Sequence, residues 1–431
     1  MISEAKSVRV LLVSVNREEI NMATWPLGLA CVATATANAG HDVALLDLMQ
    51  EPDPYAAIEH AVRKFNPEVI GVSVRNVDDQ QMQDTKSFLG DVKNLIGHFR
   101  TISSAPIVLG GAGYSIYPES ALNYLGADIG IPGEGEALFL QLVERIGSDR
   151  HPATTPGVLV PGSRVAAKRE FILNLDQFPL PDVKLISPAK YHTGEFWMPV
   201  QTRRGCPLKC SYCSTPAIEG LRLRKRSIHT VVHWLSECVA SGINRFYFVD
   251  NTFNLPGSYA RELCSAIAKA DFHISWRCIL YPAKMDEKLV ELMARAGCVE
   301  VSLGFESGCE TILEAMNKRF TPQDVRESTR LLARYGIRTM GFIMLGGPGE
   351  TMDSAEQSLQ FGDSLNLDAM KITLGIRIYP HTRLARQAVE AGIITSGDDL
   401  LTPRFYMVPE LGEPLGRLVK KWMSQRPNWM M

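Results

Sequence analysis

The sequence predicts an α/β protein in which a doubly wound parallel sheet is followed by a partial (β/α)6 barrel and a short C-terminal extension. Three observations predict this architecture. Short apolar runs of strand length alternate with amphipathic segments of helix length along most of the chain. The alternation breaks between residues 147 and 195, where proline, glycine and charged residues lack a sustained period. A chain of 431 residues that is 45% hydrophobic can fill a core in each of two or three domains.

Residues 1–146 predict one α/β domain, because strands and helices alternate in them without interruption. Strands that are apolar on both faces need crossover helices on each side, which favours a parallel, doubly wound sheet. We expect strands at 8–15, 41–48, 67–74 and 105–111, with helices at 27–40 and 84–100.

Residues 147–195 predict a linker with a small β excursion, after which the alternation resumes over residues 196–390. Six strands with five intervening helices suit an incomplete barrel, whose chemistry is expected at the carboxyl ends of the strands. The expected strands are 198–203, 245–250, 273–279, 299–307, 338–346 and 368–380, and the expected helices are 228–241, 257–270, 286–296, 322–334 and 352–365. Residues 391–431, rich in aromatic residues and methionine, are expected to cap the barrel mouth, although packing against barrel helices explains them equally well.

Composition and charge exclude several classes of partner. A net charge of −2 and a pI near 6.5 give no electrostatic case for a nucleic-acid or membrane-surface partner, which usually needs a clustered basic face. The sequence has no secretion signal and no run of about 18 apolar residues. We therefore expect a cytoplasmic protein, in which the scattered cysteines are core residues and form no disulfide framework.

Three of the nine cysteines lie together in the stretch RRGCPLKCSYCSTP, at Cys206, Cys210 and Cys213. Structural zinc needs a fourth ligand, and the next histidines after the cysteines, His229 and His233, lie on a predicted helix. A thioredoxin-like pair would leave Cys206 unexplained. Three thiolates on one loop suit a [4Fe–4S] cluster, in which each ligand binds one iron and the fourth iron stays open. A zinc site completed by histidine remains the alternative.

The segment CPLKCSYC, with its CxxxCxxC spacing and an aromatic residue before the last cysteine, resembles the signature of the radical S-adenosylmethionine (SAM) superfamily. The resemblance implies that SAM chelates the open iron and that one electron cleaves its C–S bond. The resulting 5′-deoxyadenosyl radical would abstract hydrogen from a substrate. It also implies an external one-electron donor of the flavodoxin or ferredoxin type.

Later segments strengthen the resemblance at the ends of the predicted barrel strands. VSLGFESG, MNKRFT, GFIMLGGPGET and IYPHTRLA resemble elements of the family's fourth, fifth and sixth strands and their loops. By this resemblance, the SAM-binding residues would be Tyr212, Asp250, Glu306, Ser307, Gly341, Gly346 and Tyr379. Weaker substrate candidates are Asn251, His381 and Arg383. Asp250 could equally cap a helix, and His381 and Arg383 could simply mark a different turn.

The N-terminal domain resembles the Rossmann-like, cobalamin-binding domain of B12-type radical enzymes through PLGLA, PEVIGVS, IVLGGAGYS and GADIGIPGEGE. The cobalamin-binding residues implied by it are Leu27, Gly28, Ser73, Gly110, Gly111 and Gly133. The glycines could instead serve tight turns in any doubly wound sheet. The sequence lacks the DxHxxG motif of proteins that bind the lower axial position of cobalt. Two interpretations follow: cobalamin bound without a protein imidazole, or a domain that has lost its cofactor.

The combined resemblance implies cobalamin-dependent methyl transfer to an unactivated carbon or phosphorus of a small metabolite. One alternative is a radical enzyme with a vestigial B12 domain that cyclises or couples its substrate, including transfer of a 3-amino-3-carboxypropyl group from SAM to a carbon or heteroatom. A noncatalytic B12 or iron–sulfur sensor is a third hypothesis. Methylthiolation of transfer RNA is disfavoured, because a second cysteine trio and a basic face are both missing from the sequence.

Overall fold

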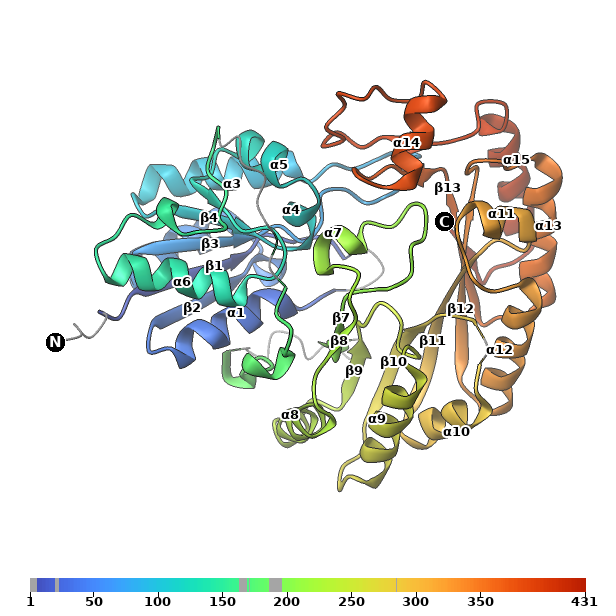
Figure 1. Cartoon of the computed structure of the whole chain (residues 1–431), viewed down its shortest axis with the longest axis horizontal. Helices are drawn as coiled ribbons and strands as arrows, with labels where there is room; N and C mark the ends of the chain where they lie inside the picture. Colours follow the sequence, from blue (N-terminus) through green and yellow to red (C-terminus); the bar gives the residue numbers. More distant parts are fainter. Residues whose placement is uncertain (1–5, 20–22, 163–168, 170, 186–195, 284) are drawn as a thin grey trace. The chain divides into compact units, whose positions relative to one another are not determined.

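The computed structural model describes residues 6–19, 23–162, 169, 171–185, 196–283 and 285–431. Its contacts divide the chain into two compact units (Figure 1). Unit 1 comprises Met1–Asp79, Lys86–Phe196 and Pro216–Gly220, and unit 2 comprises Gln80–Thr85, Trp197–Thr215 and Leu221–Met431.

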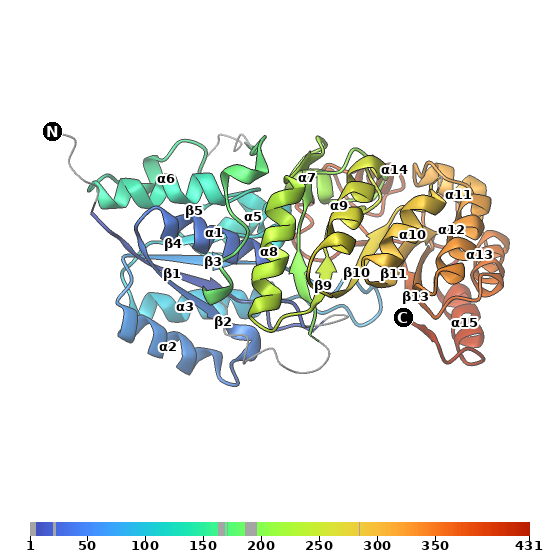
Figure 2. The same cartoon turned by 90° about the horizontal axis from the view of Figure 1, so that it is seen from below.

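Unit 1 is built on a five-stranded parallel sheet with the order β2-β1-β3-β4-β5. The strands are β1 (Arg9–Ser14), β2 (Asp42–Asp47), β3 (Val69–Ser73), β4 (Ile107–Gly110) and β5 (Ile129–Gly130). The principal helices are α1 (Leu27–Asn38), α2 (Pro54–Phe65), α3 (Leu89–Ile102), α4 (Ala112–Ile116), α5 (Pro118–Leu125) and α6 (Glu136–Gly147). Helices α1 and α6 pack together on one face of the sheet, and α2 and α3 pack on the other (Figure 2). The predicted doubly wound fold is confirmed.

The strand order places a crossover on each side of β1, because the chain runs from β1 to β2 and then returns to β3 beside β1. Doubly wound sheets bind ligands at the carboxyl edge where this reversal occurs. The core beneath it is apolar, with Val10, Leu12 and Val108 of the strands against Phe139 and Leu142 of α6. Each such fully buried side chain contributes about 1.5–3 kcal/mol.

Unit 2 is built on a seven-stranded parallel sheet with the order β16-β13-β12-β11-β10-β9-β6. The strands are β6 (Met198–Val200), β9 (Arg245–Phe248), β10 (Ser275–Leu280), β11 (Cys298–Glu306), β12 (Arg338–Leu345), β13 (Ala369–Leu374) and β16 (Trp429–Met430). Its longer helices are α8 (Ile228–Ala240), α9 (Gly257–Lys269), α10 (Glu287–Arg295), α12 (Pro322–Arg334), α13 (Met352–Ser364), α14 (Arg383–Glu390) and α15 (Gly412–Met423). The sheet has two edges, β6 and β16, as the predicted partial barrel requires.

Alternate residues of the barrel strands point toward the helices. Along β10, Trp276, Cys278 and Leu280 are buried, whereas Arg277 and Ile279 are half-buried. The buried face packs on the helix layer; for example, Trp234 of α8 lies edge-on to Phe246 of β9, with ring centroids 6.2 Å apart. The period of two therefore separates a helix-covered face from the concave inner face of the sheet.

The C-terminal segment differs in part from the predicted cap over residues 391–431. Strand β15 (Phe405–Tyr406) pairs with β14 (Ile376–Arg377), and β16 extends the barrel sheet beside β13. Trp422 and Trp429 stack at 5.9 Å, with the Arg426 guanidinium over both rings. The stacked tryptophans at this end of the chain thus hold the edge strand β16 against the helix α15.

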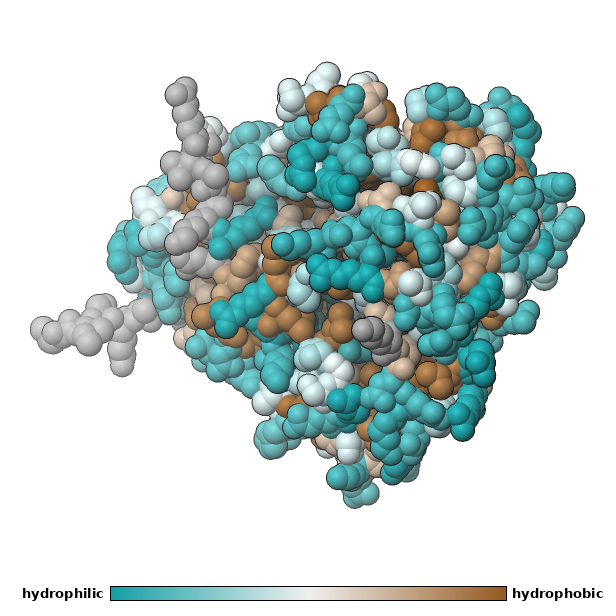
Figure 3. Space-filling view, turned by 45° about the vertical axis from the view of Figure 1, so that its right-hand side comes forward, coloured by the Kyte–Doolittle hydropathy of each residue, from teal (hydrophilic) through white to brown (hydrophobic). Residues whose placement is uncertain are grey.

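The expected β excursion of residues 147–195 is reduced, in its described part, to one bridge between Gly130 and Leu159 and short 3-10 turns. The face drawn in Figure 3 is mainly hydrophilic, with smaller apolar groups among the polar residues. Within the described ranges, no helix combines the length and apolar character needed to cross a bilayer.

Candidate active site

The three clustered cysteines lie on a loop that begins after β7 (Arg203–Arg204), at the carboxyl end of the first barrel strand. Gly205 has a φ of 84°, which lets the chain turn sharply before Cys206. None of the three cysteines is in a disulfide; Cys206 is buried, and Cys210 and Cys213 are half-buried. The Cys213 N–H donates to the Cys210 carbonyl at 3.3 Å, so these two residues share one tight turn.

Backbone hydrogen bonds from distant elements fix this cysteine loop. The Ser211 N–H donates to the Met316 carbonyl at 3.0 Å, and the Ser211 carbonyl accepts the Leu384 N–H at 2.9 Å. The Asn317 side chain also donates to the Lys209 carbonyl. The segments after β11 and β14 therefore hold the middle of the loop in position.

Asp250, at the end of β9, holds the start of the loop. Its carboxylate accepts the N–H groups of Thr202 and Arg203 at 2.7 and 2.8 Å and the Thr202 hydroxyl at 2.6 Å. It also forms an ion pair with the Arg203 guanidinium at 2.7 Å, with both side chains 1% exposed. These bonds occupy both carboxylate oxygens, so the described contacts of Asp250 are structural, unlike the SAM contact that the sequence predicts.

Arg203 has partners on its other side as well. Its guanidinium donates to the Phe253 carbonyl at 2.6 Å and lies over the rings of Phe253 and Tyr259 at 5.0 and 4.8 Å. A buried charge requires such a complete set of partners. This residue is a component of the site that sequence reasoning missed, because a strand-end arginine ordinarily indicates a solvated turn.

Glu306, at the end of β11, lies in a second buried cluster next to the cysteines. A register shift in the pairing with β12 and a φ of 64° redirect it at the strand end. Its carboxylate accepts the Tyr212 hydroxyl at 2.9 Å and the Lys318 ammonium at 3.0 Å. The side chains of Lys318 and Glu306 are 5% and 9% exposed. Two residues predicted to bind SAM, Tyr212 and Glu306, are therefore brought together.

The charges in this cluster perturb one another strongly. Burial alone would lower the pKa of Lys318, but the Glu306 charge and the neighbouring Tyr212 and Cys210 outweigh it and raise that pKa well above its usual range. Burial, reinforced by Glu306, raises the pKa of Tyr212 well above its usual range. Lys318 is thus a buried cation at neutral pH and Tyr212 a neutral hydrogen-bond donor.

The remaining barrel candidates are dispersed. Ser307 is fully buried and bonds the Ser358 hydroxyl at 2.8 Å, and Gly341 lies within β12 against Leu367 and Phe305. Gly346, with a φ of 92°, ends β12 against Met407.

Tyr379 is buried, with the Arg377 guanidinium 5.3 Å from its ring centre. Asn251 accepts the Thr215 hydroxyl at 3.3 Å, next to the cysteine loop. His381 is exposed in the turn before α14, Arg383 is exposed as the first residue of that helix, and Thr382 between them caps it. Their described positions favour the turn interpretation over substrate contact.

In unit 1, all six cobalamin candidates lie at the carboxyl edge of the sheet or in the turns and helix start that follow it. Gly111 has a φ of 101°, and a Cβ there would approach the Val74 carbonyl oxygen to 2.6 Å, so its own backbone requires glycine. A Cβ at Gly28 would instead meet no atom within 4 Å, and one at Gly110 would make an ordinary contact with the Ile131 carbonyl oxygen at 3.8 Å. The Gly133 N–H donates to the Ser115 hydroxyl at 2.8 Å. Leu27 begins α1, and Ser73 is half-buried at the end of β3.

A cavity of about 220 Å³ lies at this edge, where β1 and β3 end side by side. Its lining includes Asn16, Arg17, Tyr55, Arg75 and Asn76. The Asn76 amide donates to Asn16 at 3.1 Å across the two strand ends. This position is the switch point at which doubly wound sheets bind ligands.

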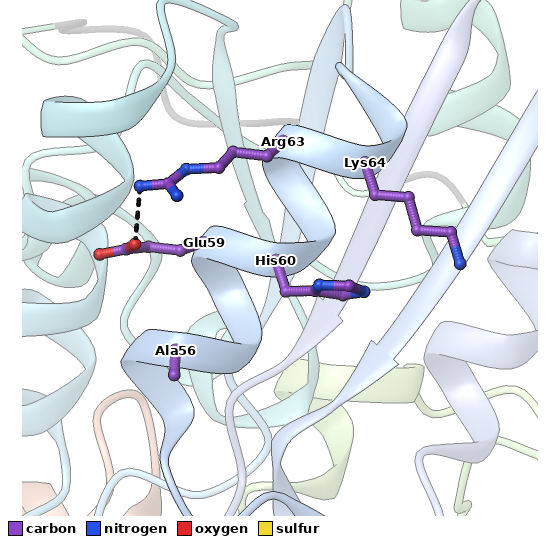
Figure 4. Close-up of a pocket in the computed structure, with 5 residues that line it drawn as sticks. All are labelled: Ala56, Glu59, His60, Arg63 and Lys64. Carbon is purple, nitrogen blue, oxygen red and sulfur yellow. Dashed lines mark hydrogen bonds and ion pairs between the residues drawn. The ribbon is translucent and has the colours of Figure 1, made fainter.

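A hollow of about 450 Å³ on α2 has a different character (Figure 4). All five of its lining residues come from this one helix, and Glu59 pairs with Arg63 at 3.0 Å. A single charged helix face does not converge on a ligand, so we assign no site to it.

Two family models match the chain. The model described as the radical SAM superfamily matches residues 200–362, and the model described as the B12 binding domain matches residues 13–143. The first range runs from the end of β6 into α13 and includes the cysteine loop; the second runs from β1 into α6.

Curated relatives and solved structures match over most of the chain. An uncharacterised methyltransferase of Pyrococcus horikoshii is 28% identical, over 86% of this chain and 79% of the relative. A tryptophan 2-C-methyltransferase of Streptomyces laurentii is 24% identical, over 87% and 74%. The radical SAM methyltransferase TsrM of Kitasatospora setae, solved with cobalamin and a [4Fe-4S] cluster bound, superposes with a TM-score of 0.80 at 25% identity, covering 91% of this chain and 76% of TsrM.

Proposed function

This chain belongs to the radical SAM superfamily with a B12-binding domain ahead of its barrel, and on that premise we propose that it is a cobalamin-dependent methyltransferase of a small molecule. One observation carries the proposal. A loop with three cysteines lies at the carboxyl end of the barrel strands, in a chain whose other unit has a carboxyl edge lined by glycines. These are the two places where a (β/α) barrel and a doubly wound sheet hold cofactors.

The donor set fits an iron–sulfur cluster better than a single metal ion. Within the described ranges, no three His, Cys, Asp or Glu side chains converge closely enough to hold one ion. Ligands of a cluster need not converge in this way, because each binds a different iron. We assign Cys206, Cys210 and Cys213 as the three protein ligands, which leaves one iron for SAM.

The open carboxyl edge of unit 1 fits a large planar ligand. Gly28 leaves open space at the start of α1, and the cavity between the ends of β1 and β3 adds amide, guanidinium and carboxylate groups. We assign cobalamin to this edge, with Leu27, Gly28, Ser73, Gly110, Gly111 and Gly133 around it. When bound, the cluster, SAM and cobalamin supply reductive cleavage of SAM and a transferable methyl group.

The chain's own residues bind and orient these groups. Asp250 and Arg203 fix the entry to the cysteine loop, and Glu306 with Tyr212 provides a buried polar wall beside it. Ser307, Gly341, Gly346 and Tyr379 remain candidates for SAM contacts, although the first two are packed inside the described core. Asn251 lies near enough to the loop to remain a substrate candidate.

We further propose a cytoplasmic location and an external one-electron donor of the flavodoxin or ferredoxin type, with no nucleic-acid or membrane partner. The relatives named as methyltransferases favour methyl transfer over the cyclising, coupling or aminocarboxypropyl-transferring alternatives. The acceptor is proposed to be a carbon, as the name tryptophan 2-C-methyltransferase indicates for that relative. That this carbon is unactivated stays a prediction, as does the phosphorus acceptor.

An anaerobic assay of the reconstituted protein tests the proposal. The protein is incubated with SAM and dithionite, with and without methylcobalamin, and nucleoside products are identified by mass spectrometry. S-adenosylhomocysteine that depends on corrinoid supports methyl transfer. Turnover to 5′-deoxyadenosine without corrinoid would indicate a vestigial N-terminal domain, and 5′-methylthioadenosine would indicate aminocarboxypropyl transfer.

A further inference from the structure

The strongest unexplained feature of unit 2 is a buried lysine beside the cysteine loop. Lys318 lies in the segment after α11 (Glu310–Ala315), and its side chain is 5% exposed. Lysine is almost never buried to this degree unless it is paired. The exposed Lys209, in the loop itself, is the ordinary case.

Three contacts hold the Lys318 ammonium group at one point. It donates to the Glu306 carboxylate at 3.0 Å, and it lies 5.3 Å from the ring centre of Tyr212 and 5.9 Å from that of Phe320. The Tyr212 hydroxyl closes the arrangement by donating to the same carboxylate oxygen at 2.9 Å. The ammonium is therefore fixed by an ion pair and two aromatic faces.

Tyr212 shows where the Lys318 ammonium lies relative to the cysteine loop, because Tyr212 lies between Cys210 and Cys213 in the sequence. A cation over the Tyr212 ring lies beside the loop that carries these two assigned cluster ligands. The Met316 carbonyl accepts the Ser211 N–H of this loop and the Asn317 side chain donates to the Lys209 carbonyl, which ties the segment just before Lys318 to the same place. These bonds fix the backbone of the segment beside the loop, and the ion pair with Glu306 holds the ammonium there.

We propose that Lys318 is a positioning residue that raises the reduction potential of the [4Fe–4S] cluster by placing a desolvated positive charge beside the loop that carries Cys210 and Cys213. The inference rests on the proposed function, since it presumes the cluster. Reduction adds one electron, from the external donor, to the cluster. A nearby cation stabilises the added negative charge, and burial weakens the screening that water would provide.

Glu306 lies in the same buried cluster and carries the opposite charge, so the two residues are expected to shift the reduction potential in opposite directions. Each contribution is tested by its own substitution. Potentials of iron–sulfur clusters depend on such nearby charge and on solvent exposure.

The test measures the reduction potential of the cluster. If Lys318 and Glu306 had only structural roles, removing their opposite charges would not shift this potential in opposite directions. Wild type, Lys318→Met, Lys318→Arg, Glu306→Gln and Lys209→Met are reconstituted anaerobically without SAM. Iron and sulfide content are measured first, and the cluster is then titrated potentiometrically with EPR detection of the reduced form.

At a fixed solution potential, we expect Lys318→Met to lower the ratio of reduced to oxidised cluster about tenfold. This change corresponds to a fall of about 59 mV in the reduction potential for one electron. Glu306→Gln is expected to shift the potential in the opposite direction. Lys318→Arg, which keeps the charge, and Lys209→Met, which removes an exposed charge next to Cys210, are expected to change the ratio less than about twofold.

Shifts of the same sign in Lys318→Met and Glu306→Gln, or a Lys318→Met shift no larger than that of Lys209→Met, would overturn the proposal. If Lys318→Met does not fold, the decision rests on Glu306→Gln, which must raise the potential. The double variant Lys318→Met/Glu306→Gln, which buries no unpaired charge, then replaces the single one and is expected to fall between the two extremes. A wild type without a cluster would refute the proposed function itself, which is a different outcome.

Discussion

Replacing Asp250 with asparagine should destabilise unit 2 by about 3 kcal/mol. The Asp250–Arg203 ion pair is 1% exposed on both sides, so the substitution leaves a guanidinium buried without its counter-charge. Breaking a buried pair in this way costs about 3–5 kcal/mol. The lower end of that range applies here, because Arg203 keeps the Phe253 carbonyl and the Phe253 and Tyr259 rings.

The assay is unfolding of the apoprotein by urea and by heat, followed by circular dichroism. For a unit of more than 150 residues, about 3 kcal/mol corresponds to a fall of about 6–12 °C in Tm. Glu287→Gln is the matched control, because its ion pair with Arg334 has the same 2.7 Å separation but is 50–67% exposed. Such exposed pairs contribute at most about 1 kcal/mol.

An Asp250→Asn variant that loses no more stability than Glu287→Gln would refute this account of the loop anchor. The replacement of both partners, Asp250→Leu with Arg203→Met, adds a check on the cause. It should recover much of the loss, because a buried pair exchanged for apolar residues is often nearly neutral. Failure to recover would indicate that the hydrogen bonds to the Thr202 and Arg203 backbone matter more than the charge.

Two further predictions concern Glu350 and the glycines of unit 1. Burial raises the pKa of Glu350, so the stabilising contribution of this carboxyl is complete below the pKa of the unfolded chain and is lost as pH rises through the folded pKa. Glu350→Gln should therefore raise Tm relative to wild type more at pH 8 than at pH 4. A difference in Tm that is independent of pH would contradict this. Gly111→Ala should cost about 1–3 kcal/mol in urea unfolding, because of its φ of 101° and its approach to Val74. Gly28→Ala, with open space around it, should leave stability within about 1 kcal/mol of wild type yet weaken corrinoid retention, and equal stability of the two alanine variants would refute the distinction.

Strand positions were predictable wherever a strand is long enough to show its period. Strand β12 (Arg338–Leu345) matches the expected 338–346, and β10 (Ser275–Leu280) lies within two residues of the expected 273–279. Strand β16, with two residues, is too short to carry a periodic signal, and its position depends on pairing with β13, more than fifty residues earlier.

The candidate site was predictable only where spacing carried the information. Three cysteines within eight positions indicate a cluster loop from the sequence alone, and Glu306 follows from its strand-end position. The structural role of Asp250 in anchoring the start of the cysteine loop could not be predicted, because its partner Arg203 lies 47 residues away in the sequence. Lys318 was missed because charged residues ordinarily indicate solvent exposure, and only the fold brings Glu306 and Tyr212 around it.

The central claim is that one chain holds an iron–sulfur cluster in its barrel and a corrinoid in its N-terminal unit. The most direct test is to quantify iron, sulfide and corrinoid per chain after anaerobic reconstitution with methylcobalamin, in wild type and in Cys206→Ala/Cys210→Ala/Cys213→Ala. The account predicts about four irons and one corrinoid in wild type, and a variant that loses the iron but keeps the corrinoid. Iron retained by the triple variant, or a wild type that binds no corrinoid, would contradict it.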